Sequence, residues 1–196
     1  MSPRIPALSR DTAPPESIAI LDATQRALGM IPNLHRTLAH APPALAAYAS
    51  LAAALAKGQL DPKLRESVAL ATAGFNGCAY CASAHTALGR GVGVAADELT
   101  ANLDGRSTDP RVSAALEFVG AVLERRGDVD DRAVERVRAA GFDDAQIVEL
   151  VAHVGMNTFT NLFNVFARTD IDFPRVDVIR SRQHTVATSS SKEIAR

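Results

Sequence analysis

Apolar residues recur every three or four positions along most of the chain, which is the pattern of amphipathic helices. No segment shows the strict apolar–polar alternation of a half-buried strand. We therefore predict an all-α protein. Its expected helices cover residues 15–28, 44–57, 62–73, 78–90, 95–103, 110–126, 130–140 and a long segment from 143 or 144 to 167. A short segment at 33–40 and a polar, turn-rich connection at 102–109 lie between them.

Helix boundaries are marked by residues with defined roles at helix ends. Asp61-Pro62 and Asp109-Pro110 each supply an N-cap and a proline suited to the first helical position. Gly29 supplies a stop, because glycine adopts the left-handed conformation that ends many helices. The sequence Gly-Phe-Asn-Gly at 74–77 predicts a break at which the flanking helices can fold back on each other.

A weak internal repeat relates two parts of the chain. KLRESVA at 63–69 resembles QIVELVA at 146–152, an offset of 83 residues. The same offset places CAYC at 78–81 over NLFN at 161–164. Either a helical hairpin is duplicated and only the first copy kept its thiols, or two amphipathic helices look alike by chance. The sequence leaves both interpretations open.

Composition supports a single helical domain. The 196 residues are 47% hydrophobic, which is enough to bury a core. Alanine occurs 36 times, which favours close-packed helices over sheets. We expect one domain over residues 1–180. Residues 181–196 form a polar tail that we expect to be frayed or packed on a partner.

Charge and motif content exclude several classes of function. The 21 basic and 22 acidic residues give a net charge of −1, which argues against a nucleic-acid partner. The longest uncharged apolar-rich run, 41–56, is short for a membrane span and contains two prolines, so no membrane partner is expected. Prolines stand where an N-terminal export signal needs an apolar core, which predicts a cytoplasmic location. No nucleotide or flavin motif is present, and we expect no cofactor.

The two cysteines carry the clearest chemical signal. Two thiols are too few for a disulfide scaffold, but Cys78 and Cys81 share one face of a predicted helix, one turn apart. That spacing is compatible with a disulfide, given suitable rotamers. Gly77 stands directly before Cys78, which places the cysteine pair at a helix N-terminus. Free backbone N–H groups and the helix dipole favour a thiolate there.

Two further residues can share a site with the thiols. His85 lies four residues after Cys81, on the same helix face, and can exchange a proton with a thiol near neutral pH. Glu66 would lie about 18 Å from Cys78 on one unbroken helix. If the chain turns at 74–77, Glu66 approaches His85 and the cysteines instead.

This arrangement resembles the signature of the alkylhydroperoxidase AhpD-like family, within the carboxymuconolactone decarboxylase superfamily. The matching pattern is Glu66, eleven residues, Cys78-x-x-Cys81, three residues and His85. NGCAYCASAHTALGR at 76–90 resembles the family's core segment. NTFTNLFNVFARTDIDFPRV at 157–176 is similar to the closing segment of its peroxidase-related branch.

The resemblance implies an AhpD-like helical bundle, with a redox core at about 44–104, and a thiol peroxidase site. By position, Cys81 would be the peroxidatic thiol and Cys78 the resolving thiol and proton donor. Glu66 and His85 would form a proton relay. Better-known members have a histidine directly before the second cysteine, where this chain has Tyr80. Its hydroxyl can donate a hydrogen bond, but a phenol with a pKa of ~10 is a poor base.

The resemblance also implies partners. These are a hydroperoxide substrate, an external dithiol reductant of lipoyl or thioredoxin-like type, and further copies of the chain in a dimer, trimer or hexamer. The long apolar helix to residue 167 supports assembly, because a monomer of this size can hardly cover it. Two alternatives remain open: a decarboxylase or lactone-acting member of the superfamily, and a redox-sensing helical oligomer that does not turn over.

Other chemistry-bearing residues have simpler interpretations. A structural zinc on Cys78, Cys81 and His85 lacks a second ligand pair at matching spacing. His35 and His40 are read as helix-end caps that could also line the site. His153 is read as a hydrogen-bonded core residue. We expect core or subunit-interface roles for Phe159, Phe163 and Phe166, and paired amides in a helix or subunit contact for Asn157, Asn161 and Asn164.

Overall fold

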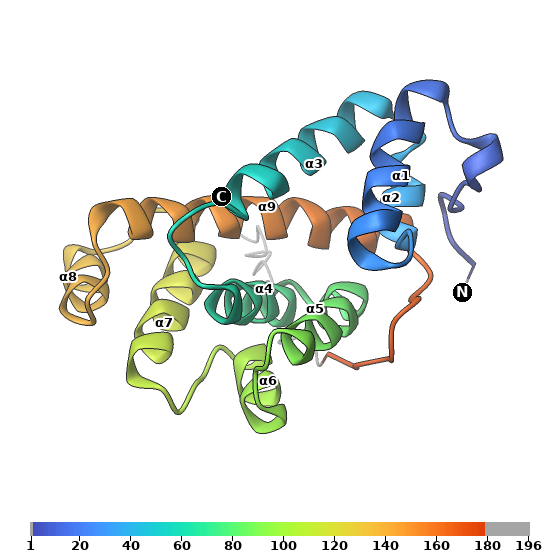
Figure 1. The fold of residues 1–196 in the computed structure, drawn as a ribbon. Helices are drawn as coiled ribbons and strands as arrows, with labels where there is room; N and C mark the ends of the chain where they lie inside the picture. Colours follow the sequence, from blue (N-terminus) through green and yellow to red (C-terminus); the bar gives the residue numbers. More distant parts are fainter. Residues whose placement is uncertain (1, 179–196) are drawn as a thin grey trace, which may run out of the picture.

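The computed structural model describes residues 2–178, and their regular secondary structure is helical throughout (Figure 1). The helices are η1 (Arg10–Thr12), α1 (Pro15–Leu28), α2 (Asn33–Leu38), α3 (Pro42–Leu55), α4 (Pro62–Asn76), α5 (Ala79–Gly91), α6 (Ala96–Leu103), α7 (Pro110–Arg125), α8 (Asp131–Ala139) and α9 (Asp144–Ala167). The all-α prediction is confirmed. The predicted tail at 181–196 lies outside the described residues.

Helix α4 is the centre of the fold (Figure 1). It packs against α5, α6, α7 and α9, and Leu64 and the seven consecutive residues 67–73 are buried. One apolar cluster joins α4 to α7, α8 and α9, whereas a second joins α1, α2 and α3 to α5. The two cysteines belong to the second cluster. The chemistry-bearing segment is therefore held in the protein interior.

The break between α4 and α5 is narrower than the sequence predicts. Helix α4 continues through Gly74 to Asn76, and the chain turns only at Gly77, where φ is +65°. Glycine adopts this left-handed conformation without the penalty that a Cβ brings. Gly74 has a different role, because a Cβ there would collide with the backbone carbonyl of Leu103 in α6. Gly74 thus permits close packing and does not end the helix.

The second repeat segment does not form a hairpin. Helix α9 runs without interruption over 24 residues, through the positions that correspond to the α4–α5 turn. Thr160 stands 83 residues after Gly77, and a β-branched residue does not support the left-handed turn that glycine makes. The structural likeness of the two repeat segments therefore extends only to the first arm, in which both α4 and α9 begin after an aspartate N-cap.

Helix α9 also leaves an apolar stripe exposed. Phe163 packs against the second cluster, as expected, but Phe159 and Phe166 are 43% and 56% exposed. The exposed large residues on this helix are Val148, Val151, Phe159, Leu162 and Phe166, which we call the α9 stripe. Within residues 2–178, no helix combines the length and the apolar character needed to cross a membrane.

Candidate functional site

The thiols lie at the N-terminus of α5, directly after the Gly77 turn. Cys78 is the N-cap residue, and its Sγ accepts a hydrogen bond from the Cys81 backbone N–H at 3.2 Å. Its thiol also points at Cys81, with the two sulfur atoms 2.6 Å apart. Both side chains are buried, at 1% and 2% exposure. The structure thus pairs the two cysteines at a helix N-terminus, as the spacing predicts.

The two thiols differ in acidity. Burial alone would raise the pKa of Cys81, but the hydrogen bond from Cys78, the charge of His85 and the amides of Asn164 and Asn161 outweigh it. Together they lower this pKa to about 7. The pKa of Cys78 moves up, because its thiol donates to Cys81 and because it is buried. The pair therefore holds its negative charge on Cys81, and a thiolate is the reactive form of cysteine.

His85 and Glu66 form a hydrogen-bonded pair beside the thiols. His85 Nδ1 lies 2.8 Å from Glu66 Oε2, which joins α5 to α4 across the Gly77 turn. Their side chains are 22% and 19% exposed, so the pair is reachable from outside. Burial lowers the pKa of His85, but Glu66 and the Cys81 thiolate raise it more, and the net direction is upward. The fold brings all four predicted residues into one place.

Helix α9 adds a group that sequence analysis did not assign to the site. Asn164 Nδ2 donates to the Cys81 Sγ at 3.3 Å. One turn earlier, Asn161 Oδ1 accepts from Asn76 Nδ2 at 3.0 Å, and Asn76 is the last residue of α4. The expected amide pair in a helix contact is present for Asn161, which pairs with Asn76 of α4, whereas Asn164 contacts the Cys81 thiol. The offset of 83 residues was the available signal, since it pairs Cys81 with Asn164.

Tyr80 does not replace the missing histidine. Its hydroxyl accepts a hydrogen bond from the Leu34 backbone N–H at 3.0 Å, near the start of α2. Its ring packs edge-on against Phe173. Burial, partly offset by the Leu34 hydrogen bond, raises the pKa of Tyr80, so its phenol remains protonated. Tyr80 anchors α2 and the loop after α9 to α5, and it is not placed to act as a base.

Tyr48, on α3, lies within electrostatic range of the site. Burial, followed by the negative charges of Cys81 and Glu66, raises its pKa to about 12. Its ring lies 5.4 Å from that of His35, whose pKa burial lowers to about 4. His35 therefore contacts Tyr48, which in turn lies near the site, and the His35 ring is neutral at neutral pH. His40 instead hydrogen bonds to the Pro6 carbonyl at 2.9 Å, and so holds the N-terminal segment.

A cavity of about 220 Å³ opens beside the His85–Glu66 pair. Helices α3, α4, α5 and α9 contribute to its walls, with Ala52, Arg65, His153 and Met156 among the lining residues. His153 is buried, as predicted, but its Nε2 finds no hydrogen-bond partner among residues 2–178. The expectation of a hydrogen-bonded core histidine is wrong for this atom, because His153 borders the cavity.

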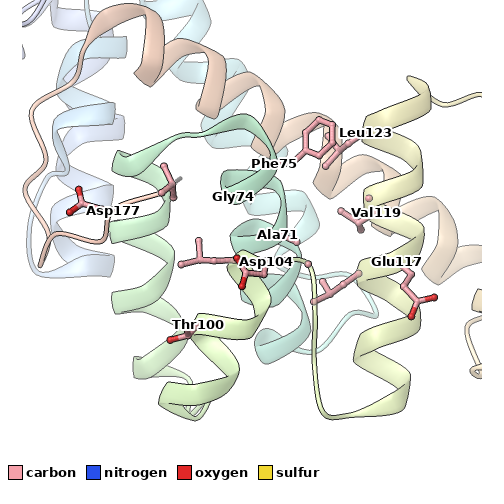
Figure 2. A pocket seen from close by; sticks show the side chains of 14 residues that line it. Ala71, Gly74, Phe75, Thr100, Asp104, Glu117, Val119, Leu123 and Asp177 are labelled. Carbon is pink, nitrogen blue, oxygen red and sulfur yellow. The ribbon is translucent and has the colours of Figure 1, made fainter. Parts of the chain in front are cut away.

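The larger cavity lies elsewhere. It measures about 500 Å³ and runs between α4, α6, α7 and the segment at 177–178 (Figure 2). Phe75, Val119 and Leu123 form apolar wall, while Asp104 and Glu117 carry carboxylates (Figure 2). None of the four predicted site residues lines it. Among residues 2–178, no three His, Cys, Asp or Glu side chains come together in an arrangement that could hold a metal ion.

Known proteins match both the central sequence and the fold. The carboxymuconolactone decarboxylase family matches residues 42–124, which include all four predicted site residues. No curated protein sequence matches the chain. A solved structure described as an alkylhydroperoxidase AhpD core, an uncharacterized peroxidase-related protein from Ralstonia eutropha JMP134, is 26% identical with a TM-score of 0.77. The match covers 87% of this chain and 92% of that one.

Two further structures share the fold at lower identity. An uncharacterized peroxidase-related protein from Silicibacter sp. TM1040 is 23% identical, with a TM-score of 0.76 over 87% of this chain and 94% of that one. A variant of the debrominase Bmp8, in complex with 2,3,4-tribromopyrrole, is 19% identical, with a TM-score of 0.75 over 88% of this chain and 93% of that one. At these identities the likeness concerns the fold alone.

Proposed function

The chain belongs to the carboxymuconolactone decarboxylase superfamily, in its AhpD-like group, and on this premise we propose that it is a thiol-dependent hydroperoxidase or disulfide oxidoreductase. One observation carries the proposal. Two buried sulfurs 2.6 Å apart stand next to a His85–Glu66 pair joined at 2.8 Å. A thiolate nucleophile, a resolving thiol and a proton carrier are the three groups that the reduction of a peroxide by a dithiol needs.

Cys81 is the attacking thiol in this proposal. Its pKa of about 7 supplies a large thiolate fraction at neutral pH. The thiolate attacks the terminal oxygen of a hydroperoxide, so that an S–O bond forms while the O–O bond breaks. The sulfur loses two electrons, and the leaving oxygen accepts them together with a proton. His85 is placed to supply that proton, since Glu66 favours its charged form.

Cys78 then closes the cycle on the protein. Its sulfur attacks the sulfur of the Cys81 sulfenic acid, a disulfide forms, and the oxygen leaves as water with the Cys78 proton. The short sulfur–sulfur distance supports this step without movement of a helix. An external dithiol restores both thiols by two exchange reactions and is itself oxidised to a disulfide. We propose a lipoyl-type or thioredoxin-like carrier for this role.

Intact-mass analysis after addition of one equivalent of an organic hydroperoxide tests the cycle. Wild type should lose two hydrogens, Cys78→Ser should gain one oxygen, and Cys81→Ser should show no peroxide-dependent change. Dihydrolipoamide should return oxidised wild type to its reduced mass. Peroxide-dependent oxidation that continues unchanged in Cys81→Ser would overturn the assignment of the attacking thiol.

The same experiment separates the alternatives. Thiols that ignore the peroxide in wild type would favour a decarboxylase or lactone-acting enzyme, whose chemistry needs no dithiol. Oxidation that proceeds once, resists dithiol rescue and changes the assembly state would favour a redox-sensing oligomer. No feature of the described residues favours either alternative over the thiol cycle.

A further inference from the structure

Two polar atoms next to Cys81 are buried without a hydrogen-bond partner. Among residues 2–178, neither Asn161 Nδ2 nor Asn164 Oδ1 makes a hydrogen bond of normal geometry, although the Asn161 amide lies close enough to Cys81 to lower the pKa of its thiol. Both residues are almost fully buried, at 0% and 3% exposure. Leaving a buried donor and a buried acceptor unpaired costs stability, and native proteins rarely do so without a reason. The reason is expected to lie in the reaction, because these amides line the nucleophile.

The orientation of the two amides is fixed by neighbours. Asn76 Nδ2 donates to Asn161 Oδ1 at 3.0 Å, which leaves the Asn161 amino group as the free end. Asn164 Nδ2 donates to the Cys81 sulfur at 3.3 Å, which leaves the Asn164 oxygen as the free end. Asn161 and Asn164 are three residues apart on α9, so their side chains share one helix face. One free donor and one free acceptor therefore stand on the helix face that contacts the sulfur.

We propose that these two amide groups bind the oxygen that Cys81 takes from the peroxide. Asn161 Nδ2 donates a hydrogen bond to that oxygen, and Asn164 Oδ1 accepts a hydrogen bond from its O–H group. The proposal rests on the proposed peroxidase function. The terminal O–H of a hydroperoxide needs one donor and one acceptor, and so does the S–O–H group that the reaction leaves on Cys81. The same two hydrogen bonds can follow the oxygen from the peroxide to the sulfenic acid.

The chemical step balances with these groups in place. The Cys81 thiolate attacks the terminal oxygen with an electron pair, and the S–O bond forms as the O–O bond breaks. The terminal oxygen keeps its proton and donates a hydrogen bond through it to Asn164 Oδ1. The other oxygen leaves with the electron pair and takes a proton from His85, as an alcohol. The negative charge that develops as the O–O bond breaks lies on the leaving oxygen, which His85 protonates, and the Asn161 N–H holds the attacked oxygen in line with the Cys81 sulfur. Asn76 is a positioning residue, because it acts through Asn161.

The test compares two reactions of the same thiolate. Iodoacetamide alkylates Cys81 without transferring oxygen, whereas tert-butyl hydroperoxide transfers it. Both rates are measured from pH 5 to 9 and expressed per thiolate, which removes any change in the thiol pKa. We expect Asn161→Ala to slow the peroxide reaction by up to about tenfold per thiolate, because the attacked oxygen loses the one hydrogen bond that positions it. Alkylation per thiolate should stay within about twofold.

Two more variants complete the comparison. Asn76→Ala should also slow the peroxide reaction per thiolate, but by less than Asn161→Ala, because it leaves the Asn161 amide in place and only frees it to rotate. Asn102→Ala removes a buried amide of α6 that bonds to Glu98 and Arg106, and it should alter neither rate. Equal losses of peroxide and alkylation rates in Asn161→Ala, or no selective loss, would overturn the proposal.

A spectroscopic measurement covers the case in which Asn161→Ala fails to fold. In Cys78→Ser, oxidation of Cys81 to the sulfenic acid should move the Asn161 side-chain amide proton resonance downfield, since that N–H gains a bond. An unmoved resonance in the oxidised protein would contradict the proposal. Wild type that is alkylated normally but ignores the peroxide would instead refute the proposed function, so the two failures are distinguishable.

Discussion

The α4–α5 segment and helix α9 share a sequence pattern at an offset of 83 residues, yet they differ in backbone and in chemistry. In the first, Gly77 adopts a left-handed conformation and the chain restarts as α5, with Cys78 as its cap. In the second, the helix continues and asparagines occupy the cysteine positions. The two segments then meet, because Asn164 donates to Cys81.

The glutamates at the equivalent positions also differ in use. Glu66 pairs with His85 beside the thiols. Glu149, 83 residues later, accepts from the backbone N–H groups of Gln59 and Leu60, just before α4. A single glycine turn therefore distinguishes the segment that holds the dithiol and the Glu66–His85 pair from the helix that supplies a hydrogen bond to Cys81. In the proposed function, the groups that react lie on the broken segment, and the intact helix supports them.

The largest effect should follow from a negative charge on the intact helix. Asn164→Asp replaces a donor to Cys81 with a carboxylate, which raises the thiol pKa because like charges disfavour the thiolate. If the thiol pKa rises by about two units from about 7, we expect alkylation of Cys81 by iodoacetamide at pH 7 to fall by about 50-fold. In Asn164→Leu, whose new side chain is similar in size and uncharged, the rate of alkylation of Cys81 should fall only several-fold. Equal rates in the two variants would argue against a charge effect.

The outer face of the same helix should hold copies of the chain together. The α9 stripe is apolar and exposed, while α4 is covered on several sides. Leu162→Glu should weaken self-association by about 30-fold, in the range of an interface hot spot. As a control, Leu28→Glu changes an exposed leucine of α1 and should leave self-association unchanged. Sedimentation velocity at micromolar concentration measures both, and a monomeric wild type would refute the prediction.

The two glutamates provide a matched pH test. Glu66 raises the pKa of His85, so Glu66→Gln lowers it, and less of His85 is charged at pH 7. Cys81 then loses a cationic neighbour, and the midpoint of its pH–alkylation profile should move upward from about 7. A shift of one unit lowers the rate at pH 6 about tenfold. Glu149→Gln should leave the midpoint in place, and an equal shift in both variants would contradict this account.

The smallest effects should come from the glycines, with opposite signs. Gly77→Ala forces a Cβ into a left-handed conformation and should destabilise the protein by about 1–2 kcal/mol. Gly155 lies inside α9, where a Cβ would meet nothing within 4 Å. Gly155→Ala should therefore stabilise by about 0.5–1 kcal/mol. Urea unfolding of both variants provides the measurement. A stabilised Gly77→Ala would show that the turn accepts alanine without strain, and a destabilised Gly155→Ala would show that α9 does not accept a methyl group there.

Much of the helical architecture was predictable because local signals agree with the fold. Asp61 and Asp109 cap the helices that follow them, as their position before proline predicts. The Glu66–Cys78–Cys81–His85 pattern identified residues that the structure places together. The role of Gly74 was not predictable, since its need for space comes from Leu103 in another helix.

The sequence by itself determined the all-helical class, the helix boundaries within a few residues, and the dithiol with its histidine and glutamate. These follow from periodicity, capping and spacing, which act over a few residues of chain. Only the tertiary structure decided that α9 stays unbroken, that Tyr80 anchors α2, and that Asn161 and Asn164 face the thiols. These contacts join residues 46 to 85 positions apart. They depend on how whole helices pack, and no local pattern encodes that packing.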